Sequence, residues 1–316
     1  METKLQINKD LFTPLTDDEK VFVGNERPSV GYWAHAWRRL RSNKVALVSL
    51  IVIILTILAA VFCPILSEFN YDTTNLSNTN QLPSGKHLFG TDHLGRDLLV
   101  RTMYGARYSL IIAFAATGIN LVVGVLYGGI SGFIGGKVDN IMMRFVDVLY
   151  SIPTIIYVVL LMAVFNSMPG SEEKTGIGAI ILALSISYWV GMARIVRGDI
   201  LQLKQQEFVL AARSLGASKT RILMRHLIPN CMGSILVTLT LLIPQAIFME
   251  AFLSFLGLGL NAPLASLGTL TNDAMKSIYS YPYQLLFPAA MICIIILAFN
   301  LLGDGLTEAL DPKHQR

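Results

Sequence analysis

Charged side chains are scarce in this chain of 316 residues. Asp, Glu, Lys and Arg make up 15% of it, against 53% hydrophobic residues. That balance is too apolar for a water-soluble domain of this length, so the lipid bilayer is the expected solvent. Cysteine is also rare. Cys63, Cys231 and Cys293 form no CxxC pair and have no histidine at a metal-ligand spacing, which indicates small apolar packing residues.

The sequence motifs of common enzymes are missing as well. There is no GxxxxGK[ST] phosphate-binding loop, no Ser/His/Asp set and no evident pair of catalytic carboxylates. Gly257 and Gly259 form only a fragment of a dinucleotide-loop pattern. His87 and His93 lack a carboxylate or thiol in a recognised spacing, which makes them weak evidence for a metal. We therefore expect no catalytic residue, no cofactor and no metal site in this chain, and we do not expect an enzyme.

What the chain does contain is long apolar runs. A membrane-spanning helix needs about 20 mostly apolar residues. The first run carries no charge, and its leader is too long and too acidic for a cleavable signal peptide. The sequence predicts an all-α, polytopic membrane protein with six transmembrane helices, at about 45–66, 109–134, 145–165, 177–196, 231–258 and 285–305.

The distribution of Lys and Arg predicts the orientation. If the N-terminus is cytoplasmic, 19 of the 25 basic residues fall in cytoplasmic segments and six in outer ones. Basic residues concentrate on the cytoplasmic side of membrane proteins, so we expect both termini inside. The net charge of +4 is then explained by basic residues that bind the anionic lipids of the inner leaflet. No nucleic-acid partner is expected.

The chain divides by composition into four parts. Residues 1–44 form a cytoplasmic tail and an interfacial helix, where Trp33 and Trp37 stand beside Arg38, Arg39 and Arg41. Rings at the headgroup level and cations toward anionic lipid are typical of such a helix, although simple basic flanking of the first span is an alternative. Residues 45–108 hold the first span and an outer loop, 109–305 a five-helix core with a cytoplasmic loop at about 197–230, and 306–316 a cytoplasmic C-terminal tail.

The end of the outer loop concentrates charge. Asp92 and Asp97 lie close to Arg96 and Arg101, with Arg107 further on. Charges this close to a span usually pair with one another, and we expect Asp92 or Asp97 to pair with Arg96 or Arg101. An ordered turn into the second span and a contact with an external partner are both open.

Glycines recur along the second span. Gly124, Gly128 and Gly132 are four residues apart and fall on one helical face. Such a face lets another backbone approach closely, so we expect this helix to pack against another helix in this chain or in a partner.

The segment from Glu207 to Asn230, EFVLAARSLGASKTRILMRHLIPN, is polar and basic between two apolar runs. Good helix formers continue to Leu215, Gly216 can end that helix in a left-handed conformation, and Ser218 can cap a following helix that runs into the fifth span. The small Ala211 and Ala212 would let a soluble partner approach. Glu207 and Arg213 would orient that partner by charge. An amphipathic helix lying on lipid is the alternative.

The same segment resembles the cytoplasmic EAA loop of ABC importer permeases, whose general pattern is E-A-A-x3-G-x9-I-x-L-P. Ala211, Ala212, Gly216 and Pro229 match it. Leu210, His226 and Ile228 depart from it, and an acidic residue stands three positions early, at Glu207. Most of residues 36–316, including LFGTDHLGRDLLVRTMYGARYSL, AFLSFLGLGL and DGLTEALDPK, are similar to the C-type permease subunit of oligopeptide and dipeptide ABC importers.

The resemblance implies a type I ABC importer permease (MetI-like) fold in the inner or plasma membrane of a bacterium. It implies a second homologous permease subunit, two cytoplasmic ABC ATPases that bind ATP and Mg, and an extracytoplasmic peptide-binding protein. The residues expected to transmit ATPase movements are Glu207, Ala211, Ala212, Arg213 and Gly216. Oligopeptides are the expected substrate, with dipeptides or nickel as alternatives in the same family.

Polar residues inside the predicted spans are candidates for the substrate pathway. Glu250 is the sharpest, because an ionisable group at membrane depth is costly and usually faces the interior of a bundle. Gln245 lies five residues earlier, and Asn120 and Asn300 lie in the second and sixth runs. We expect Glu250 and Gln245 to face the pathway. The alternative places Glu250 near the outer interface, paired with Arg96 or Arg107.

Two other classes of function remain to be weighed. A self-contained secondary carrier would need a relay of intramembrane carboxylates or broken helices at the midplane, and the sequence offers only Glu250. A structural scaffold would not require the docking segment.

Overall fold

The computed structural model describes residues 32–168, 176–260 and 263–310. Regular structure in these residues is helical, apart from one isolated bridge between Thr91 and Asp97. The all-α prediction is thereby confirmed. Most of the predicted N-terminal tail and residues 311–316 lie outside the described part of the chain.

Within the described residues, five helices are long and apolar enough to cross a membrane. Each contains or closely matches one of the expected runs. The main difference is α3, which begins well before residue 109 and has 37 residues, or roughly 55 Å at the α-helical rise. The five are α2 (Lys44–Leu66), α3 (Leu98–Ile134), α6 (Ile177–Leu203), α10 (Met232–Phe255) and α12 (Tyr283–Leu310).

The remaining run, expected as one span at 145–165, is broken. It forms α4 (Gly136–Ser151) and α5 (Thr154–Ser167), with a bend of 85° between them. The cause is Pro153: proline lacks the N–H that would continue the helix, and it forces Ile152 into an extended conformation. The expectation of an uninterrupted span here was wrong, and the count of six spans holds if the bent pair crosses as one.

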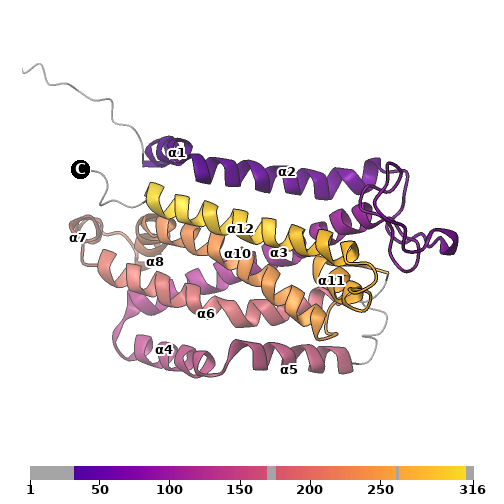
Figure 1. Cartoon of the computed structure of the whole chain (residues 1–316). Coiled ribbons are helices and arrows are strands. Elements are labelled where there is room, and N and C mark those ends of the chain that lie inside the picture. The colour runs from indigo at the N-terminus through magenta and orange to yellow at the C-terminus, as the bar shows by residue number, and fades with distance from the viewer. Residues whose placement is uncertain (1–31, 169–175, 261–262, 311–316) are drawn as a thin grey trace, which may run out of the picture.

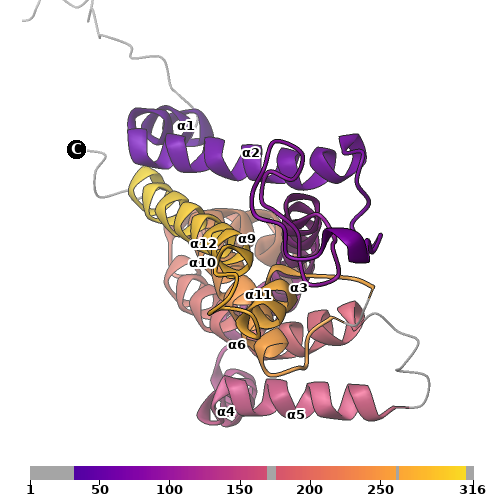
Figure 2. The same ribbon diagram turned by 45° about the vertical axis from the view of Figure 1, so that its right-hand side comes forward.

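The helices form an elongated bundle with two distinct ends (Figure 1). One end carries α1 (Tyr32–Ser42), α7 (Glu207–Ser214), α8 (Lys219–Arg221) and the end of α12. The opposite end carries the loop between α2 and α3, with a 3₁₀ turn at Leu76–Asn78, and α11 (Leu267–Met275). Helix α2 lies along one edge of the bundle and the α4–α5 pair along the opposite edge (Figures 1 and 2).

The helices α3 and α6 approach each other along the expected glycine face. A Cβ atom added at Gly124 would lie 2.6 Å from the Cβ of Met192, and one at Gly132 would lie 2.9 Å from the carbonyl oxygen of Arg197. At Gly128 an added Cβ would overlap the backbone of Ala193. The prediction of a tightly packed helix face is confirmed, and the partner helix belongs to this chain.

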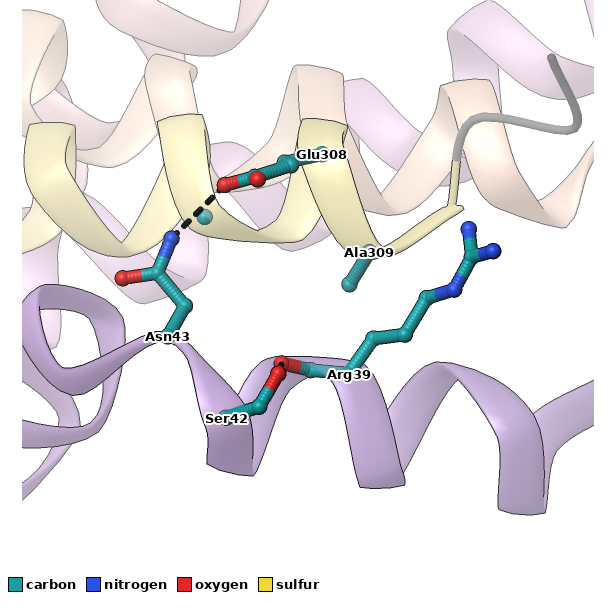
Figure 3. A pocket seen from close by; sticks show the side chains of 6 residues that line it. Arg39, Ser42, Asn43, Glu308 and Ala309 are labelled. Carbon is teal, nitrogen blue, oxygen red and sulfur yellow. Dashed lines mark hydrogen bonds between the residues drawn. The ribbon is translucent and has the colours of Figure 1, made fainter. Parts of the chain in front are cut away.

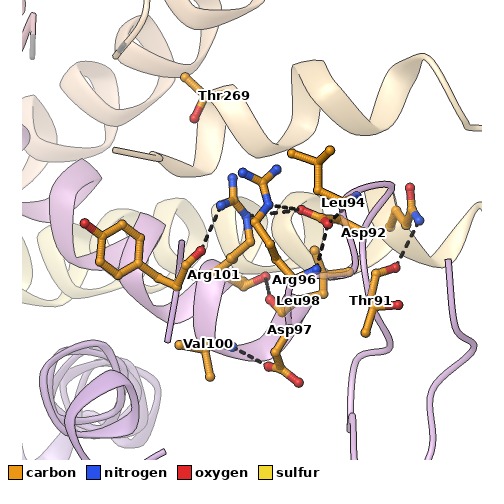
Figure 4. Close-up of polar contacts among 12 residues, drawn as sticks. Thr91, Asp92, Leu94, Arg96, Asp97, Leu98, Val100, Arg101 and Thr269 are labelled. Atoms are coloured by element: carbon orange, nitrogen blue, oxygen red, sulfur yellow. Dashed lines mark hydrogen bonds and ion pairs between the residues drawn. The ribbon is translucent and has the colours of Figure 1, made fainter. Parts of the chain in front are cut away.

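The loop before α3 is held by the charges that the sequence singled out (Figure 4). Arg96 Nε donates a hydrogen bond of 2.7 Å to Asp92, and Arg101 Nε lies 3.5 Å from the same carboxylate. Asp97 takes a different partner, His87 Nδ1 at 2.8 Å, and also caps the start of α3. The pairing prediction is confirmed for Asp92, and this part of the loop forms an ordered turn into α3.

The same loop packs on the start of α12. The Tyr283 hydroxyl donates to the Thr91 carbonyl at 3.2 Å, and the rings of Phe89 and Phe287 stack with centroids 4.0 Å apart. Among the described residues, no group of three or more His, Cys, Asp and Glu side chains is placed to hold a metal. A contact between this loop and an external partner stays a prediction.

The basic and aromatic segment before the first span forms helix α1, which Figure 1 shows turned across the direction of α2. Its Trp33 and Trp37 are about half exposed. Asn43, at the corner between α1 and α2, donates a hydrogen bond of 2.8 Å to Glu308 of α12, beside a pocket of about 320 Å³ (Figure 3). The interfacial role of α1 and the four-part division of the chain stay predictions.

Candidate functional site

The segment from Glu207 to Asn230 begins with the short helix α7, whose local structure follows the sequence closely. The helix ends where Gly216 adopts a left-handed φ of +80°, and the Ala217 N–H donates to the Ala212 carbonyl at 3.0 Å across that turn. Ser218 then caps the next turn by accepting a hydrogen bond from the Arg221 N–H at 3.3 Å. Both capping predictions are confirmed.

The connection to the fifth span is less regular than expected. Helix α8 leads into a π-helical segment, Ile222–Leu227, then α9 (Ile228–Asn230), and α10 begins only at Met232. Pro229 provides the reason, because its ring clashes with the carbonyl of Arg225 and it has no N–H to donate there. The π-helical turn is wider than an α-helical turn and relieves that clash. In it the Ile228 N–H donates to the Leu223 carbonyl, five residues back. The helix predicted from Ser218 into the fifth span is present, but it is interrupted by this π-helical segment and by a turn at Cys231.

Helix α7 is anchored to the bundle through its inner side. Val209 is fully buried, and Ala212 is partly buried against the same cluster. That cluster includes Ile200 of α6 and Ile222 and Leu223 of the π-helical segment. Ala212 thus faces its own chain, whereas Ala211 is exposed. Of the two alanines expected to admit a partner, only Ala211 lies on the free side.

The outer side of α7 presents apolar and charged groups together. Leu210 is 52% exposed and Leu215 is 88% exposed, although both are large apolar side chains. Glu207, Arg213 and Gly216 are exposed beside them. A short helix with one buried side and an apolar, charge-flanked outer side has the form of a docking surface for a protein.

A set of polar contacts supports this end of the bundle. Arg197 of α6 binds Asp139 of α4 through two hydrogen bonds of 2.6 and 2.7 Å. Ser131 of α3 donates to the same carboxylate, and Lys204 donates to the Gly132 carbonyl at 2.7 Å. Sequence reasoning missed this network. The available signal was an acidic residue, Asp139, between Lys137 and Arg144 in the short stretch between the second and third predicted spans.

Glu250 occupies a closed site between α3, α10 and α11. It is 0% exposed, and its two carboxylate oxygens accept hydrogen bonds from Ser109 at 2.8 Å and Ser254 at 2.9 Å. The Leu267 N–H, at the start of α11, donates to the Ser109 hydroxyl at 3.2 Å. In this conformation Glu250 neither faces an open pathway nor pairs with Arg96 or Arg107. Both expectations for its side chain are replaced by a buried polar contact among three helices.

Gln245 lies in a different setting. It is exposed and lines an open hollow of about 290 Å³ in the bundle. The other lining residues are Tyr188, Pro244, Phe248, Ile296 and Asn300. Asn300 was flagged by the sequence as a polar residue in a span, whereas nothing in the sequence pointed to Tyr188. The pathway role of Gln245 stays a prediction.

Comparison with known proteins identifies the family. Residues 120–316 match the family described as binding-protein-dependent transport system inner membrane component. The chain belongs to this family of transport permeases. Residues 31–83 also match the N-terminal transmembrane domain of oligopeptide transport permease C. The permease is accordingly a multi-pass bacterial membrane protein, as its apolar helices indicate.

Named relatives align with this permease over nearly its whole length. It is 50% identical to the oligopeptide transport system permease protein OppC of Bacillus subtilis, over 98% of this chain and 99% of the relative. It is 48% identical to the dipeptide transport system permease protein DppC of the same organism, over 92% and 89%. With OppC of Escherichia coli K12 the identity is 45%, over 90% and 92%.

Solved structures support the fold. A chain of the inward-facing MetNI methionine ABC transporter superposes with a TM-score of 0.52 at 18% identity. The match covers 67% of this permease and 96% of that chain. The MetI-like permease fold implied by the sequence resemblance is confirmed.

Proposed function

We propose that this permease is one transmembrane subunit of a multi-subunit ABC importer that takes up oligopeptides. The observation that carries the proposal is helix α7, which is buried on one side by Val209 and free on the other at Ala211 and Leu215. A short helix with an exposed apolar and charged side is suited to binding a soluble partner. The names of the aligned relatives, oligopeptide and dipeptide transport permeases, support the class of substrate.

The proposed complex contains three kinds of partner, four chains in all. A second homologous permease encloses the pathway with this chain, and two cytoplasmic ATPases, which hold ATP and Mg, dock on the α7 helices of the two permeases. An extracytoplasmic peptide-binding protein delivers the substrate. We place both termini of this chain on the cytoplasmic side, because α1, α7 and the end of α12 share one end of the bundle (Figure 1) and that end is rich in basic residues.

Movement of the ATPases reaches the spans through packed side chains. Pressure on α7 passes through Val209 to Ile200 of α6 and to Ile222 before α10. The close contact of α3 with α6 and the Arg197–Asp139 pair make α3, α4 and α6 move together. ATP-driven closure of the ATPases would rotate this unit and switch the pathway between inward-facing and outward-facing states. No step requires catalysis by this chain.

Peptide length is set elsewhere. The similar identity to oligopeptide and dipeptide relatives supports peptides as a class, and we propose that the binding protein selects their length.

Gentle affinity purification of the tagged chain from its own membrane tests the proposal. We expect to recover a second permease and two ATPases with it. An Ala211→Trp variant should retain the second permease but lose the ATPases, since the bulky ring blocks the free side of α7. Ala34→Trp is the matched control, because Ala34 is an exposed alanine on α1 at the same end of the molecule. Recovery of a stable, homogeneous chain without any partner would instead indicate a self-contained carrier.

A further inference from the structure

Three neutral polar side chains border one open hollow on the side of the bundle. Tyr188 comes from α6, Gln245 from α10 and Asn300 from α12, and the hollow between them measures about 290 Å³. Helix α10 packs against both α6 and α12, and the three helices lie side by side in Figure 1. Phe248 and Ile296 provide apolar walls.

The hollow lies at half the depth of the spans. Gln245 is near the centre of α10, whose bounds are Met232–Phe255, and Tyr188 is near the centre of α6, Ile177–Leu203. Asn300 is ten residues from the α7 end of α12, roughly 15 Å along the helix axis. The three polar groups therefore share one level, well away from both water interfaces.

These groups have no hydrogen-bond partner among the residues that the structure describes. The Gln245 and Asn300 amides and the Tyr188 hydroxyl each remain unpaired there, and all three border the same open space. An unpaired amide or hydroxyl facing lipid is strongly disfavoured, because lipid offers it no hydrogen-bond partner. Three such groups at one level indicate a space that holds water or a polar ligand.

The lining also limits the kind of ligand. No charged side chain borders the hollow, and Glu250, one and a half turns away on α10, is closed off by Ser109 and Ser254. Carboxamide groups both donate and accept hydrogen bonds, as a peptide bond does. Pro244, which also lines the hollow, has no N–H to donate to the carbonyl of Thr240 one turn before it.

We propose that this hollow binds the main chain of a peptide in transit, with Gln245 and Asn300 pairing its amide groups, Tyr188 adding a hydroxyl, and Phe248 and Ile296 contacting its side chains. The proposal rests on the proposed import of peptides and adds the residues that recognise them. Neutral groups that bind the main chain accept peptides of either side-chain charge, which suits a pathway whose selectivity lies in a separate binding protein.

Photo-crosslinking in the assembled transporter tests the site directly. Phe248→p-benzoylphenylalanine places a reactive group in the hollow, and Phe114→p-benzoylphenylalanine places the same group on an exposed face of α3. During ATP-driven uptake of radiolabelled Ala-Ala-Ala, we expect label on the chain in the first variant and not in the second. Crosslinking of Phe248 only to the second permease or to lipid would overturn the proposal.

Variants of the polar groups supply the second measurement. Asn300→Leu and Gln245→Leu should each reduce peptide crosslinking at position 248 roughly fivefold to tenfold, the effect of losing about one hydrogen bond. Thr117→Val is the matched control, because its buried hydroxyl is also unpaired in the described part but lies on α3, outside the hollow. Equal effects in all three variants would overturn the proposal.

Failure of this inference is distinguishable from failure of the proposed function. The wild-type complex could take up Ala-Ala-Ala without a crosslink at position 248 and without dependence on Asn300 and Gln245. That result would reject peptide binding in the hollow and leave the import function standing. If the wild-type complex takes up no peptide, both the proposed import function and peptide binding in the hollow are rejected.

Discussion

Two serine hydroxyls and one backbone N–H determine the setting of Glu250. Ser109 and Ser254 donate to the carboxylate, and Leu267 at the start of α11 donates to Ser109. A buried carboxyl group is tolerated when it is hydrogen-bonded in this way. The result is that one side chain joins α3, α10 and the start of α11 at a single point.

Replacing Glu250 by alanine should destabilise the permease. The change leaves the Ser109 and Ser254 hydroxyls buried without their acceptor, at a cost of about 1–3 kcal/mol for each group left unpaired. We expect a lower unfolding temperature of the purified complex, measured by size-exclusion chromatography after heating. Glu308→Ala is the control: it removes an exposed hydrogen bond to Asn43, so its effect should be small. Equal thermal stability of both variants would contradict the assigned role of Glu250.

At the scale of the helices, α3 and α6 make an extensive and close contact at the centre of the bundle. Three glycines on α3 bring its backbone against Met192, Ala193 and Arg197 of α6. Helix packing in a membrane depends on such close approach, because lipid gives no hydrophobic drive for helices to associate. The Arg197–Asp139 pair then attaches α4 to the same unit.

A branched side chain in this contact should prevent the permease from folding. Gly128→Val would drive a Cβ atom into the backbone of Ala193, whereas Gly118→Val on the same helix meets open space within 4 Å. We expect the first variant to be degraded and the second to reach the membrane at near wild-type abundance, as measured by immunoblot of isolated membranes. Normal abundance of Gly128→Val would show that α3 and α6 are further apart than described.

The turn after α7 allows a prediction about coupling. Gly216 has a φ of +80° with nothing near its missing Cβ, so a substitution there strains the backbone rather than clashes. Gly216→Val should leave the chain inserted but lower ATPase attachment and uptake several-fold, because β-branched residues disfavour this conformation. Gly216→Asn should retain most of the activity, since asparagine tolerates the left-handed region. Wild-type uptake by Gly216→Val would remove the assigned role of this turn.

At the scale of the molecule, the two ends of the bundle differ in kind. One end holds α1, α7 and basic groups, and the other holds a long loop locked by Asp92, Arg96 and Arg101 (Figures 1 and 4). This asymmetry matches the two tasks of an importer permease, which meets an ATPase inside and a delivering protein outside.

The orientation of the bundle can be measured by labelling. Leu82 is 68% exposed in the outer loop and Leu215 is 88% exposed after α7. In a background with the native cysteines replaced by alanine, Leu82→Cys should react with a membrane-impermeant maleimide in cells with an intact inner membrane. Leu215→Cys should react only after permeabilisation. The reverse pattern would place α7 outside and exclude ATPase docking.

The sequence by itself determined the helical class of the fold and the local structure at the end of α7. Apolar runs must span the bilayer as helices, because lipid offers no partner for backbone N–H and C=O groups. The left-handed glycine at Gly216, the cap at Ser218 and the close-packing face at Gly124, Gly128 and Gly132 depend on local backbone chemistry, and each was predictable from neighbouring residues.

Only the tertiary structure decided which side of each helix is free. Ala211 and Ala212 are adjacent residues of the same type, yet Ala211 is exposed and Ala212 packs on the bundle. Glu250 and Gln245 are both polar residues in one span, yet one is enclosed by hydroxyls and the other borders a hollow. The physical reason is that burial of a side chain depends on neighbours distant in sequence, such as Ser109 for Glu250 and Tyr188 for Gln245, and no local pattern specifies them.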